Sequence, residues 1–411
     1  MKLKSYVIVG AGQAGCNAAK ALRAADPDSK ITLIGEEAYD PYERPQLSKG
    51  ILSGTIQTSE LLVVEPDYFD IQKIVLLKSS AVVSIDPGMK EVRLSNDRRL
   101  PYDKLLLTTG SKARQLRIPG SKLKGVHYLR TLDQAKALHE HLAVAEHLVI
   151  VGAGFIGLEV ASIAKQYKNC TVTVIEAGET VLQRGVPEEM REKIHHLHQV
   201  HGVKFIFKKS AVSLLGDDLV TGVECQDGQI LSADCVVVGI GVEPRTELAQ
   251  DAGLAIQNGI VVNEFCETST TNIYAAGEVT SHWNRQLDEF IRLESWQTAQ
   301  LQSVCAAQNM TGTPTKFDQV PWFWTDQYDV NIQLVGVLSS GQQAVHRHFD
   351  ENKFIYFYFN NKKLCGAFGF NTGKYIRATQ KLLEREISPD PSILADPEQD
   401  LGKLLKSKKG P

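Results

Sequence analysis

The sequence predicts an α/β fold with two similar parallel-sheet domains and a third domain of the α+β class. A strand, a glycine-rich turn, a helix and a second strand follow one another over residues 5–35, and the same plan returns over residues 146–176. After about residue 315, short apolar runs alternate with polar turns. We therefore expect three domains, made of residues 1–112 with 246–318, residues 113–245, and residues 319–411.

The first repeat begins with an apolar strand over residues 6–9, followed by the turn GAGQAG at residues 10–15. An alanine-rich helix is expected over residues 17–25 and a second strand over residues 31–34. A further buried strand enters a glycine turn at residues 105–110. These elements predict a parallel sheet with helices on its faces.

The second repeat has a strand over residues 148–151 and the turn GAGFIG at residues 152–157. A helix over residues 158–167 and a strand over residues 171–175 complete it. Residues 235–241 form another buried strand that enters a glycine turn. Both repeats thus have the same order of elements.

The C-terminal part predicts antiparallel strands over residues 330–337, 354–359 and 364–370, and a helix over residues 376–386. One more strand, over residues 272–279, resembles those of the first repeat. Strands followed by a helix favour an α+β domain.

Composition excludes several classes of protein. With 43% hydrophobic and 23% charged residues, the chain can bury a sizeable core and is not disordered. The net charge of −3 excludes a general polyanion binder, so we expect no nucleic-acid partner. No apolar run approaches the length of a membrane span or a signal peptide, so we expect no membrane association.

Cysteine and histidine usage favours a reducing compartment without a metal site. The seven cysteines are scattered, and no two have C-x-x-C spacing, which indicates neither a zinc ribbon nor a redox dithiol. The histidines at 195, 196 and 198 are interpreted as a solvated helix face. We expect a cytoplasmic protein.

Each glycine turn is suited to bind a phosphate group. The first glycine makes the turn, the second lets the backbone approach a pyrophosphate, and the third lets the helix pack on the strand. An acidic residue at the end of the next strand accepts from a ribose hydroxyl. The first set consists of Gly10, Gly12, Gly15 and Glu36.

The second set consists of Gly152, Gly154, Gly157 and Glu176. Two complete sets indicate two dinucleotides, hence a flavoprotein that takes electrons from a nicotinamide cofactor. A carboxylate at Glu176 would repel the 2′-phosphate of NADPH, so we expect NADH, with NADPH less favoured. Arg184 follows in the same loop and could reach the cofactor.

The whole chain resembles the FAD-dependent ferredoxin reductases of bacterial oxygenase systems, namely putidaredoxin reductase and the reductase components of aromatic-ring dioxygenases, and more distantly apoptosis-inducing factor. The resemblance is carried by PYERPQLSK at residues 41–49, YLRT at 128–131, GFIGLE at 154–159, RLESW at 292–296 and PWFWTDQY at 321–328. It implies FAD in the first phosphate-binding turn and NADH in the second.

The resemblance also implies site residues. Those for FAD are Gly10, Gly12, Ala14, Gly15, Glu36, Arg44, Lys49, Val82, Thr109, Gly110, Arg130, Gly277, Glu278 and Trp296. Those for NAD are Gly152, Gly154, Phe155, Ile156, Gly157, Glu159, Glu176, Arg184 and Gly241. Three positions depart from the family pattern: Gln46 replaces a proline, Glu278 replaces an aspartate, and Arg245 stands where asparagine is common.

Lys49, Glu159 and Trp324 are the residues that we expect to act on the chemistry. A flavin converts a hydride into single electrons, so we expect no catalytic triad. Lys49 could stabilise a reduced flavin, with Glu159 as the partner that a buried lysine needs. Trp324 either relays electrons at the flavin edge or packs in a core, and Phe155 either gates the nicotinamide pocket or packs helix against sheet.

The leading interpretation is an NADH-dependent ferredoxin reductase that serves a [2Fe–2S] ferredoxin of the Rieske or plant type, as a monomer or homodimer. A flavin disulfide reductase is disfavoured because residues 36–60 contain no cysteine. A flavin NADH oxidase and an NADH-sensing flavoprotein remain alternatives. A ferredoxin is typically acidic, so a basic docking patch is expected, with Arg292, Arg347 and the C-terminal lysines Lys403, Lys406, Lys408 and Lys409 as candidates.

Overall fold

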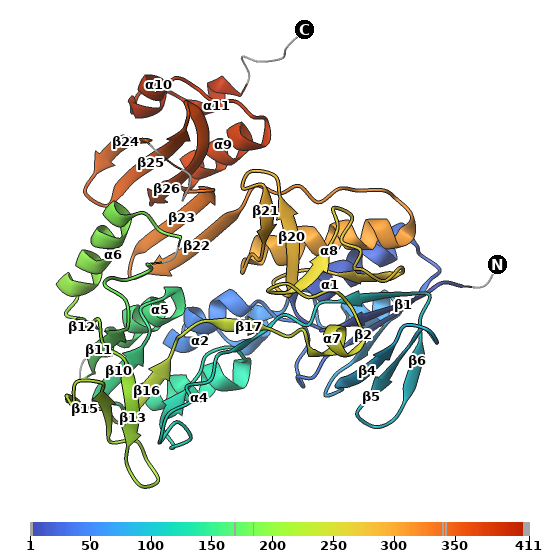
Figure 1. Cartoon of the computed structure of the whole chain (residues 1–411), viewed down its shortest axis with the longest axis horizontal. Coiled ribbons are helices and arrows are strands. Elements are labelled where there is room, and N and C mark those ends of the chain that lie inside the picture. Colours follow the sequence, from blue (N-terminus) through green and yellow to red (C-terminus); the bar gives the residue numbers. More distant parts are fainter. Residues whose placement is uncertain (1–2, 168–169, 184, 339–340, 342, 406–411) are drawn as a thin grey trace. The chain divides into compact units, whose positions relative to one another are not determined.

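The computed structural model describes residues 3–167, 170–183, 185–338, 341 and 343–405 of the chain (Figure 1). The chain forms two compact units, neither of which is one continuous stretch of sequence. The first comprises Met1–Arg44, Thr58–Lys112 and Glu243–Pro321. The second comprises Pro45–Gln57, Ala113–Val242 and Trp322–Pro411. The division into three domains remains a prediction.

The first unit is built on a parallel sheet with the strand order β19-β7-β1-β2-β3. Its strands are β1 (Ser5–Val9), β2 (Lys30–Ile34), β3 (Ile74–Leu77), β7 (Lys104–Leu107) and β19 (Ile273–Ala275). Helices α1 (Gln13–Ala25) and α8 (Trp296–Thr311) pack on each other, and buried alanine and cysteine side chains let them approach closely.

Smaller elements complete the first unit. There are two three-stranded sheets, β4-β5-β6, whose strands lie in sequence between β3 and β7, and β18-β20-β21, whose strands lie on both sides of β19. Their strands are β4 (Val82–Asp86), β5 (Glu91–Leu94), β6 (Arg99–Pro101), β18 (Ile260–Val262), β20 (Thr280–Asn284) and β21 (Glu289–Ile291). The short helices are η2 (Thr58–Leu61), α3 (Tyr68–Ile71) and α7 (Glu247–Asp251). Strands β8 (Ser111–Ala113) and β17 (Val242–Pro244) pair where the chain passes between the units.

The second unit contains a parallel sheet of the same kind, with the order β12-β11-β10-β16-β9. Its strands are β9 (Val126–His127), β10 (His147–Val151), β11 (Thr171–Glu176), β12 (Lys204–Phe207) and β16 (Cys235–Val238). Its helices are η1 (Arg44–Ser48), α2 (Gly50–Ser53), α4 (Leu132–Leu142), α5 (Phe155–Ala164) and α6 (Glu188–Val200). A small sheet holds β13 (Ala211–Leu215), β14 (Gly222–Cys225) and β15 (Ile230–Ser232).

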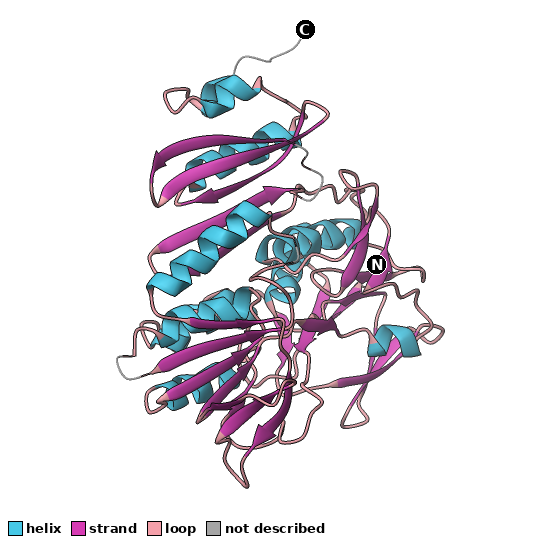
Figure 2. Cartoon of the chain, turned by 60° about the vertical axis from the view of Figure 1, so that its left-hand side comes forward, coloured by secondary structure: helices cyan, strands magenta, loops and turns pink. Residues whose placement is uncertain are grey.

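An antiparallel sheet with the order β22-β23-β26-β25-β24 forms the rest of the second unit. Its strands are β22 (Trp322–Gln327), β23 (Val330–Gly336), β24 (Gln343–Asp350), β25 (Lys353–Asn360) and β26 (Lys363–Phe370). Helix α9 (Gly373–Glu384) packs on this sheet (Figure 2), and α10 (Pro391–Ala395) and α11 (Leu401–Leu404) follow. The predicted fold class, two parallel-sheet regions and an α+β C-terminal region, is confirmed.

The structure differs from the predicted elements mainly at helix starts. Helices were expected from residues 17 and 158, but α1 begins at Gln13 and α5 at Phe155. Both helices begin inside the glycine turn, because the third glycine belongs to the first helical turn and packs on the strand before it. The strand expected over residues 272–279 ends at Ala275, because Gly277 has φ +88° and turns the chain.

None of the helices in the described part of the chain combines the length and the apolar composition that crossing a bilayer requires.

Candidate functional site

The first phosphate-binding turn joins β1 to α1, and two of its three glycines have no room for a side chain. Gly10 has φ +111°, and a Cβ there would lie 2.2 Å from the carbonyl oxygen of Thr108. A Cβ on Gly15 would lie 2.0 Å from the carbonyl oxygen of Gly10. A Cβ on Gly12 would meet no heavy atom within 4 Å among the described residues beyond its chain neighbours. The first and third glycines therefore have no room for a side chain, whereas space remains beside the middle glycine. A bound pyrophosphate requires that space.

Other predicted FAD residues lie at the same edge of the first parallel sheet. Thr109 and Gly110 follow the carboxyl end of β7, and Gly277 and Glu278 follow that of β19. Parallel strands present their carboxyl ends at one edge, so these residues gather beside the first turn. Gly277 lies directly beside the first turn, because a Cβ on Gly277 would be 3.3 Å from the Cβ of Ala14.

A buried glutamine of α8 fixes the turn at Gly277. The backbone N–H of Gly277 donates to Oε1 of Gln302 at 2.8 Å, and the Thr280 hydroxyl donates to the same oxygen at 2.9 Å. Gln302 is fully buried. We did not predict this residue. The signal for it is an amide on the buried side of α8, among small residues such as Cys305 and Ala306.

The acid of the first turn has a partner that the sequence did not explain. Arg245 donates to Oε2 of Glu36 at 2.7 Å, and both side chains are about half exposed. Arg245 is the departure from the family pattern for which we predicted no role, and it contacts the carboxylate expected to accept from a ribose. Arg44 donates to Glu37 at 2.6 Å and to the Tyr42 hydroxyl at 2.9 Å.

Two further predicted FAD residues lie in the first unit. Val82 is buried at the start of β4, and Trp296 is the first residue of α8. Burial raises the pKa of Glu43, while a hydrogen bond from Trp296 acts in the opposite direction. Lys49 and Arg130 belong to the second unit, where the backbone N–H of Arg130 donates to Gln134 just before α4.

The second phosphate-binding turn joins β10 to α5 and repeats the construction of the first. Gly152 has φ +107°, and a Cβ there would lie 2.5 Å from the carbonyl oxygen of Gly239. A Cβ on Gly157 would lie 2.2 Å from the carbonyl oxygen of Gly152, whereas a Cβ on Gly154 would come no closer than 3.8 Å to Gly239. The middle glycine again leaves room for a phosphate group.

Glu176 is held at this second turn by two backbone groups. Its Oε2 accepts from the N–H of Ala153 at 2.7 Å, and its Oε1 accepts from the N–H of Gly178 at 2.7 Å. Gly241 follows β16 at the same sheet edge, and Ile156 is exposed in the first turn of α5. Arg184 lies outside the described residues. The carboxylate of Glu176 is thus placed beside the second turn, where a nucleotide ribose is expected.

Lys49 and Glu159 form a buried ion pair, as expected. Lys49 Nζ lies 2.6 Å from Oε1 of Glu159, and the two side chains are 15% and 3% exposed. The hydroxyl of Thr325 also donates to Oε1, at 2.6 Å, and the hydroxyl of Ser48 donates to Oε2. The short helix α2 packs on α4 and α5, which holds the segment carrying Ser48 and Lys49 beside Glu159. We did not predict Ser48 or Thr325.

Residues along the β22 strand contact successive residues on one face of α5. Phe323 packs its ring on that of Phe155, with centroids 4.5 Å apart, and Thr325 bonds to Glu159. Further along, the Ser162 hydroxyl accepts from the backbone N–H of Tyr328 at 2.6 Å. Alternate residues of a strand share a face, and helix positions i, i+4 and i+7 share a stripe. The period of two in the PWFWTDQY motif puts Thr325 on the same face as Phe323, but the sequence does not reveal that this face contacts α5.

Hydrogen bonds continue from Glu159 through the second unit. The Thr325 hydroxyl accepts from Nε2 of Gln327 at 3.3 Å, and Oε1 of Gln327 lies 2.9 Å from Nε2 of His198. Nδ1 of His198 lies 3.1 Å from the Tyr328 hydroxyl. Burial lowers the pKa of His198 to about 4, so the ring is neutral and donates from Nε2 while it accepts at Nδ1. This series of hydrogen bonds fixes the orientation of the Thr325 hydroxyl.

Trp324 lies on the opposite face of β22 from Thr325. Its ring stacks on Trp322, with centroids 4.9 Å apart and planes at 22°, and the residue is half-buried. The ring of Phe155 contacts Phe323 of the antiparallel sheet. Of the two roles expected for Phe155, the contact in the structure is thus packing of a helix, α5, on a sheet. Trp324 and Glu159 therefore do not share one surface of the second unit.

Two expectations about surface residues are wrong. His198 is fully buried, and His195 packs edge-on against Phe205, so within this run only His196 is exposed. Arg347 is fully buried as well and donates to the carbonyl oxygens of Leu394, Ile393 and Gln399, which excludes it from a docking patch. Each buried side chain finds polar partners in the fold, which spacing alone does not reveal. Lys406, Lys408 and Lys409 lie outside the described residues.

A family model described as "Pyridine nucleotide-disulphide oxidoreductase" matches residues 4–303. The chain belongs to this family. A second model, described as "Reductase C-terminal", matches residues 322–405, which include the antiparallel sheet. The two models together place the pyridine nucleotide-disulphide oxidoreductase fold and the C-terminal reductase region in the order expected from the sequence.

Proteins of known name match nearly the full length of the chain. The anthranilate 1,2-dioxygenase system ferredoxin–NAD(+) reductase component of Burkholderia cepacia is 39% identical over 411 residues, covering 98% of this chain and 100% of its own. The ferredoxin reductase for the CYP199A2 system from Rhodopseudomonas palustris has a TM-score of 0.94 at 36% identity, covering 98% and 100%. The covalent putidaredoxin reductase–putidaredoxin complex contains a chain with a TM-score of 0.94 at 32% identity, covering 99% and 99%. The predicted resemblance is confirmed.

Proposed function

We propose that this protein is an NADH-dependent ferredoxin reductase of an oxygenase system, which passes electrons from NADH through FAD to a [2Fe–2S] ferredoxin. The observation that carries the proposal is the pair of phosphate-binding turns with one construction, in a chain whose full-length relatives are named ferredoxin–NAD(+) reductases. When bound, FAD accepts two electrons as hydride and gives them up singly, which is the conversion that a ferredoxin requires.

The first turn is proposed to hold FAD. The middle glycine, Gly12, leaves room for the pyrophosphate, and the N-terminus of α1 offers free backbone N–H groups to it. Glu36 would accept from the adenosine ribose, with Arg245 orienting its carboxylate. Gly277 and Glu278 lie at the same sheet edge and suit the ribityl end of the cofactor.

The second turn is proposed to hold NADH. Gly154 provides the room for the pyrophosphate, and Glu176 provides a carboxylate fixed by two backbone N–H groups. A fixed negative charge accepts from a free 2′-hydroxyl and repels a 2′-phosphate, so NADH is favoured over NADPH.

Lys49 and Glu159 are proposed to tune the flavin. The Glu159 carboxylate accepts from three donors, and its contact with Lys49 holds the ammonium group in one position. A fixed cation favours the reduced, negatively charged form of a flavin. Trp324 is proposed to lie on the electron route, since its ring is half-exposed and held by stacking on Trp322. We propose the cytoplasm as its location because the seven cysteines are scattered and no two have C-x-x-C spacing.

The test is NADH oxidation by the purified yellow protein with cytochrome c as reporter, with and without an added [2Fe–2S] ferredoxin. The proposal predicts a large ferredoxin-dependent rise in cytochrome c reduction, and much slower turnover with NADPH in place of NADH. Equal NADH consumption without ferredoxin, ending in hydrogen peroxide, would instead identify a flavin oxidase. Very slow consumption with several ferredoxins and a persistent long-wavelength charge-transfer band would identify an NADH sensor.

A further inference from the structure

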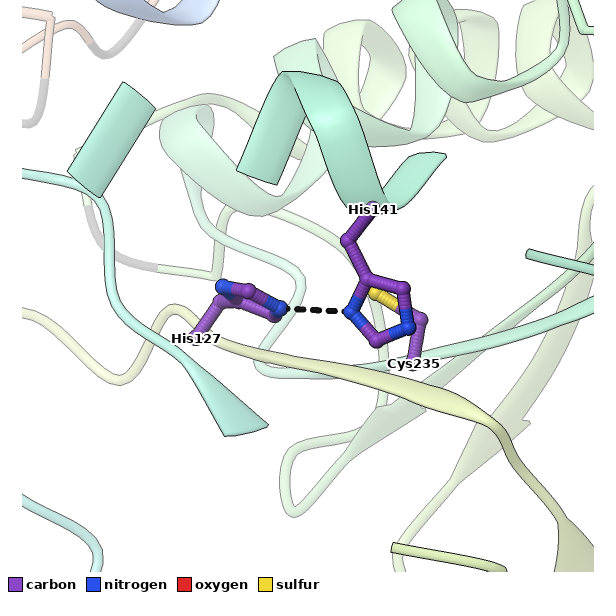
Figure 3. Close-up of side chains that lie close together, drawn as sticks. All are labelled: His127, His141 and Cys235. Carbon is purple, nitrogen blue, oxygen red and sulfur yellow. Dashed lines mark hydrogen bonds between the residues drawn. The ribbon is translucent and has the colours of Figure 1, made fainter. Parts of the chain in front are cut away.

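Three side chains with metal-binding atoms meet in the second unit at the amino-terminal edge of its parallel sheet (Figure 3). His127 ends β9, His141 lies in the last turn of α4, and Cys235 begins β16. Nε2 of His127 lies 2.7 Å from Nδ1 of His141, and the ligand atoms of the three residues lie within 4.8 Å of one another. The histidines are half-buried and the cysteine is buried, so the cluster is reached from the surface through its imidazoles.

The backbone holds these positions in place. Cys235 pairs with Leu148 in the sheet, and His127 pairs with Val237 of the same strand as Cys235. Gly125 has φ +87°, and a Cβ there would lie 3.2 Å from Cε1 of His141, so glycine leaves the room that this ring occupies. Two of the three ligands therefore stand on neighbouring strands and the third on a helix end.

The residue before Cys235 is also anchored. The carboxylate of Asp234 accepts from the backbone N–H groups of Glu146 and His147 at 3.0–3.2 Å. These bonds fix the chain at the start of β16, next to the start of β10. Rigid placement of ligands on strands and helices is what a metal site needs, because coordination tolerates little positional error.

We propose that His127, His141 and Cys235 bind a divalent transition-metal ion of the zinc class, with water in the fourth position. Two imidazoles and a thiolate are ligands that zinc prefers. Zinc lies about 2.0–2.1 Å from nitrogen and about 2.3 Å from sulfur, so tetrahedral ligand atoms are roughly 3.3–3.6 Å apart. On metal binding, the 2.7 Å contact between the histidines would widen and the longer separations would shorten.

The protons of the binding step can be followed. In the hydrogen bond, one of the two facing nitrogens carries a hydrogen, which moves to the far nitrogen of its own ring when both facing nitrogens coordinate the ion. The thiol of Cys235 loses its proton to solvent as the metal–sulfur bond forms. One proton is released for each ion bound, and no electron is transferred.

This site is remote in the sheet from the NADH turn. The turn follows the carboxyl end of β10, whereas Cys235 stands at the amino end of β16. The ion would tie the end of α4 to β9 and β16 and stabilise the second unit, and it would take no part in hydride transfer. No local spacing reveals the cluster, because its residues are far apart in the chain.

The experiment is a titration of the metal-free, FAD-loaded protein with Co²⁺, followed in the red part of the visible spectrum, where oxidised flavin does not absorb. We expect one equivalent of Co²⁺ with the intense bands of a tetrahedral thiolate site, and displacement of those bands by Zn²⁺. Cys235→Ser and His127→Gln should each weaken binding by about 100-fold or more. Cys225→Ser, a buried cysteine of the same unit, and His196→Gln, an exposed histidine, are matched controls that should bind as the wild type does.

The outcomes separate the assignment from its alternatives. Absence of tetrahedral cobalt bands at saturating Co²⁺, or bands that persist in Cys235→Ser, would overturn the site. If Cys235→Ser fails to fold, as judged by lost flavin, His127→Gln decides, because its half-buried ring is replaced at the rim of the cluster. Loss of the bands in His196→Gln would assign the ion to a surface histidine instead and equally overturn the proposal. NADH-dependent flavin reduction serves as the fold control and should be unchanged in every variant.

Discussion

Glu159 is a carboxylate taken out of water and compensated by three donors from two distant segments of the chain. Lys49 and Ser48 come from one segment and Thr325 from the other. A buried pair of this kind repays its desolvation only through good geometry, so removing one member is much more costly than removing both. Residue patterns could predict the Lys49–Glu159 pair, but hydroxyl donors such as Ser48 and Thr325 are too common in proteins to be identified without the fold.

Replacing Lys49 with methionine should lower the free energy of unfolding by about 3 kcal/mol, since the buried Glu159 side chain would lose its cationic partner and keep hydroxyl donors alone. The double variant Lys49→Met/Glu159→Gln should recover most of that loss. Urea denaturation of the FAD-loaded proteins measures both values.

Lys78→Met is the matched control for this cycle, because Lys78 pairs with Asp40 at 3.0 Å while 43% exposed. An exposed pair of this kind contributes less than about 1 kcal/mol. If Lys49→Met were as harmless as Lys78→Met, the buried pair would not be a stabilising feature of the fold.

The choice between the two nicotinamide cofactors should depend on Glu176. Glu176→Ser removes the fixed negative charge, so we expect the ratio of kcat/KM for NADPH to that for NADH to rise by about tenfold or more, which is about 1.4 kcal/mol of discrimination. Steady-state rates with each cofactor and saturating ferredoxin measure the ratio.

Glu179→Ser is the corresponding control, because Glu179 lies in the following loop, exposed, and pairs with Lys208. The ratio should not change in that variant. An unchanged ratio in Glu176→Ser would show that the carboxylate does not face the 2′ position.

At the level of elements, hydrophobic periodicity placed the strands and helices that we predicted mostly to within a few residues, but it gave no prediction for others, such as α4, α8 and β24. Its errors are at the glycine turns, because helices α1 and α5 begin before the third glycine. Glycine has low helix propensity, so a sequence pattern places the start after it, whereas close packing on the preceding strand requires it within the first turn. The pairing of α5 with β22 was also beyond prediction, since it joins segments from the middle and the end of the chain.

Alanine substitutions at two glycines of the first turn should affect different properties, namely FAD binding at Gly12 and stability at Gly15. Gly12→Ala adds a methyl group where the structure has room, so the protein should fold but bind FAD at least about tenfold more weakly. Gly15→Ala places a Cβ 2.0 Å from the Gly10 carbonyl oxygen, so it should destabilise the unit itself by about 3 kcal/mol or more.

Flavin content after purification and the thermal midpoint of the flavin-free proteins separate these two effects. Gly88→Ala is the matched control, because Gly88 is exposed, has no positive φ, and a Cβ there would come no closer than 3.4 Å to Asp86. A Gly12→Ala protein with full FAD occupancy would contradict the assigned role of the turn.

Taken as a whole, the molecule buries histidines that must stay neutral. Burial lowers the pKa of His198 to about 4 in the second unit and that of His282 to about 4 in the first. An unfolded histidine titrates near 6.5, so the unfolded state binds more protons between these values and stability falls as the pH drops from about 6.5 toward 4.

For His198 alone, the loss between neutral pH and pH 5 should be on the order of 2 kcal/mol. His198→Gln should flatten the dependence of the urea midpoint on pH over this range, while His196→Gln, at an exposed position, should leave it as in the wild type. Parallel curves for the wild type and His198→Gln would show that His198 is not the group that titrates.

The class of the whole molecule was predictable because each phosphate-binding turn is a local pattern of a few residues. The division of the chain into two units was less predictable. Residues 45–57 group with the second unit although the sequence on both sides belongs to the first. Nothing in their composition marks this, since the grouping depends on α2 packing against α4 and α5.

The interleaving of the two units bears on how the protein is made. Strand β7 lies between β1 and β19, and β19 is encoded far downstream of β7, so the first sheet keeps an open apolar edge while the whole of the intervening segment is translated. At roughly 5–20 residues per second, the nascent chain spends on the order of 10–30 s in that state. The first unit therefore cannot be completed before synthesis of the second unit begins. Chaperones that bind unfolded chains should matter more for this protein than for a chain of consecutive domains.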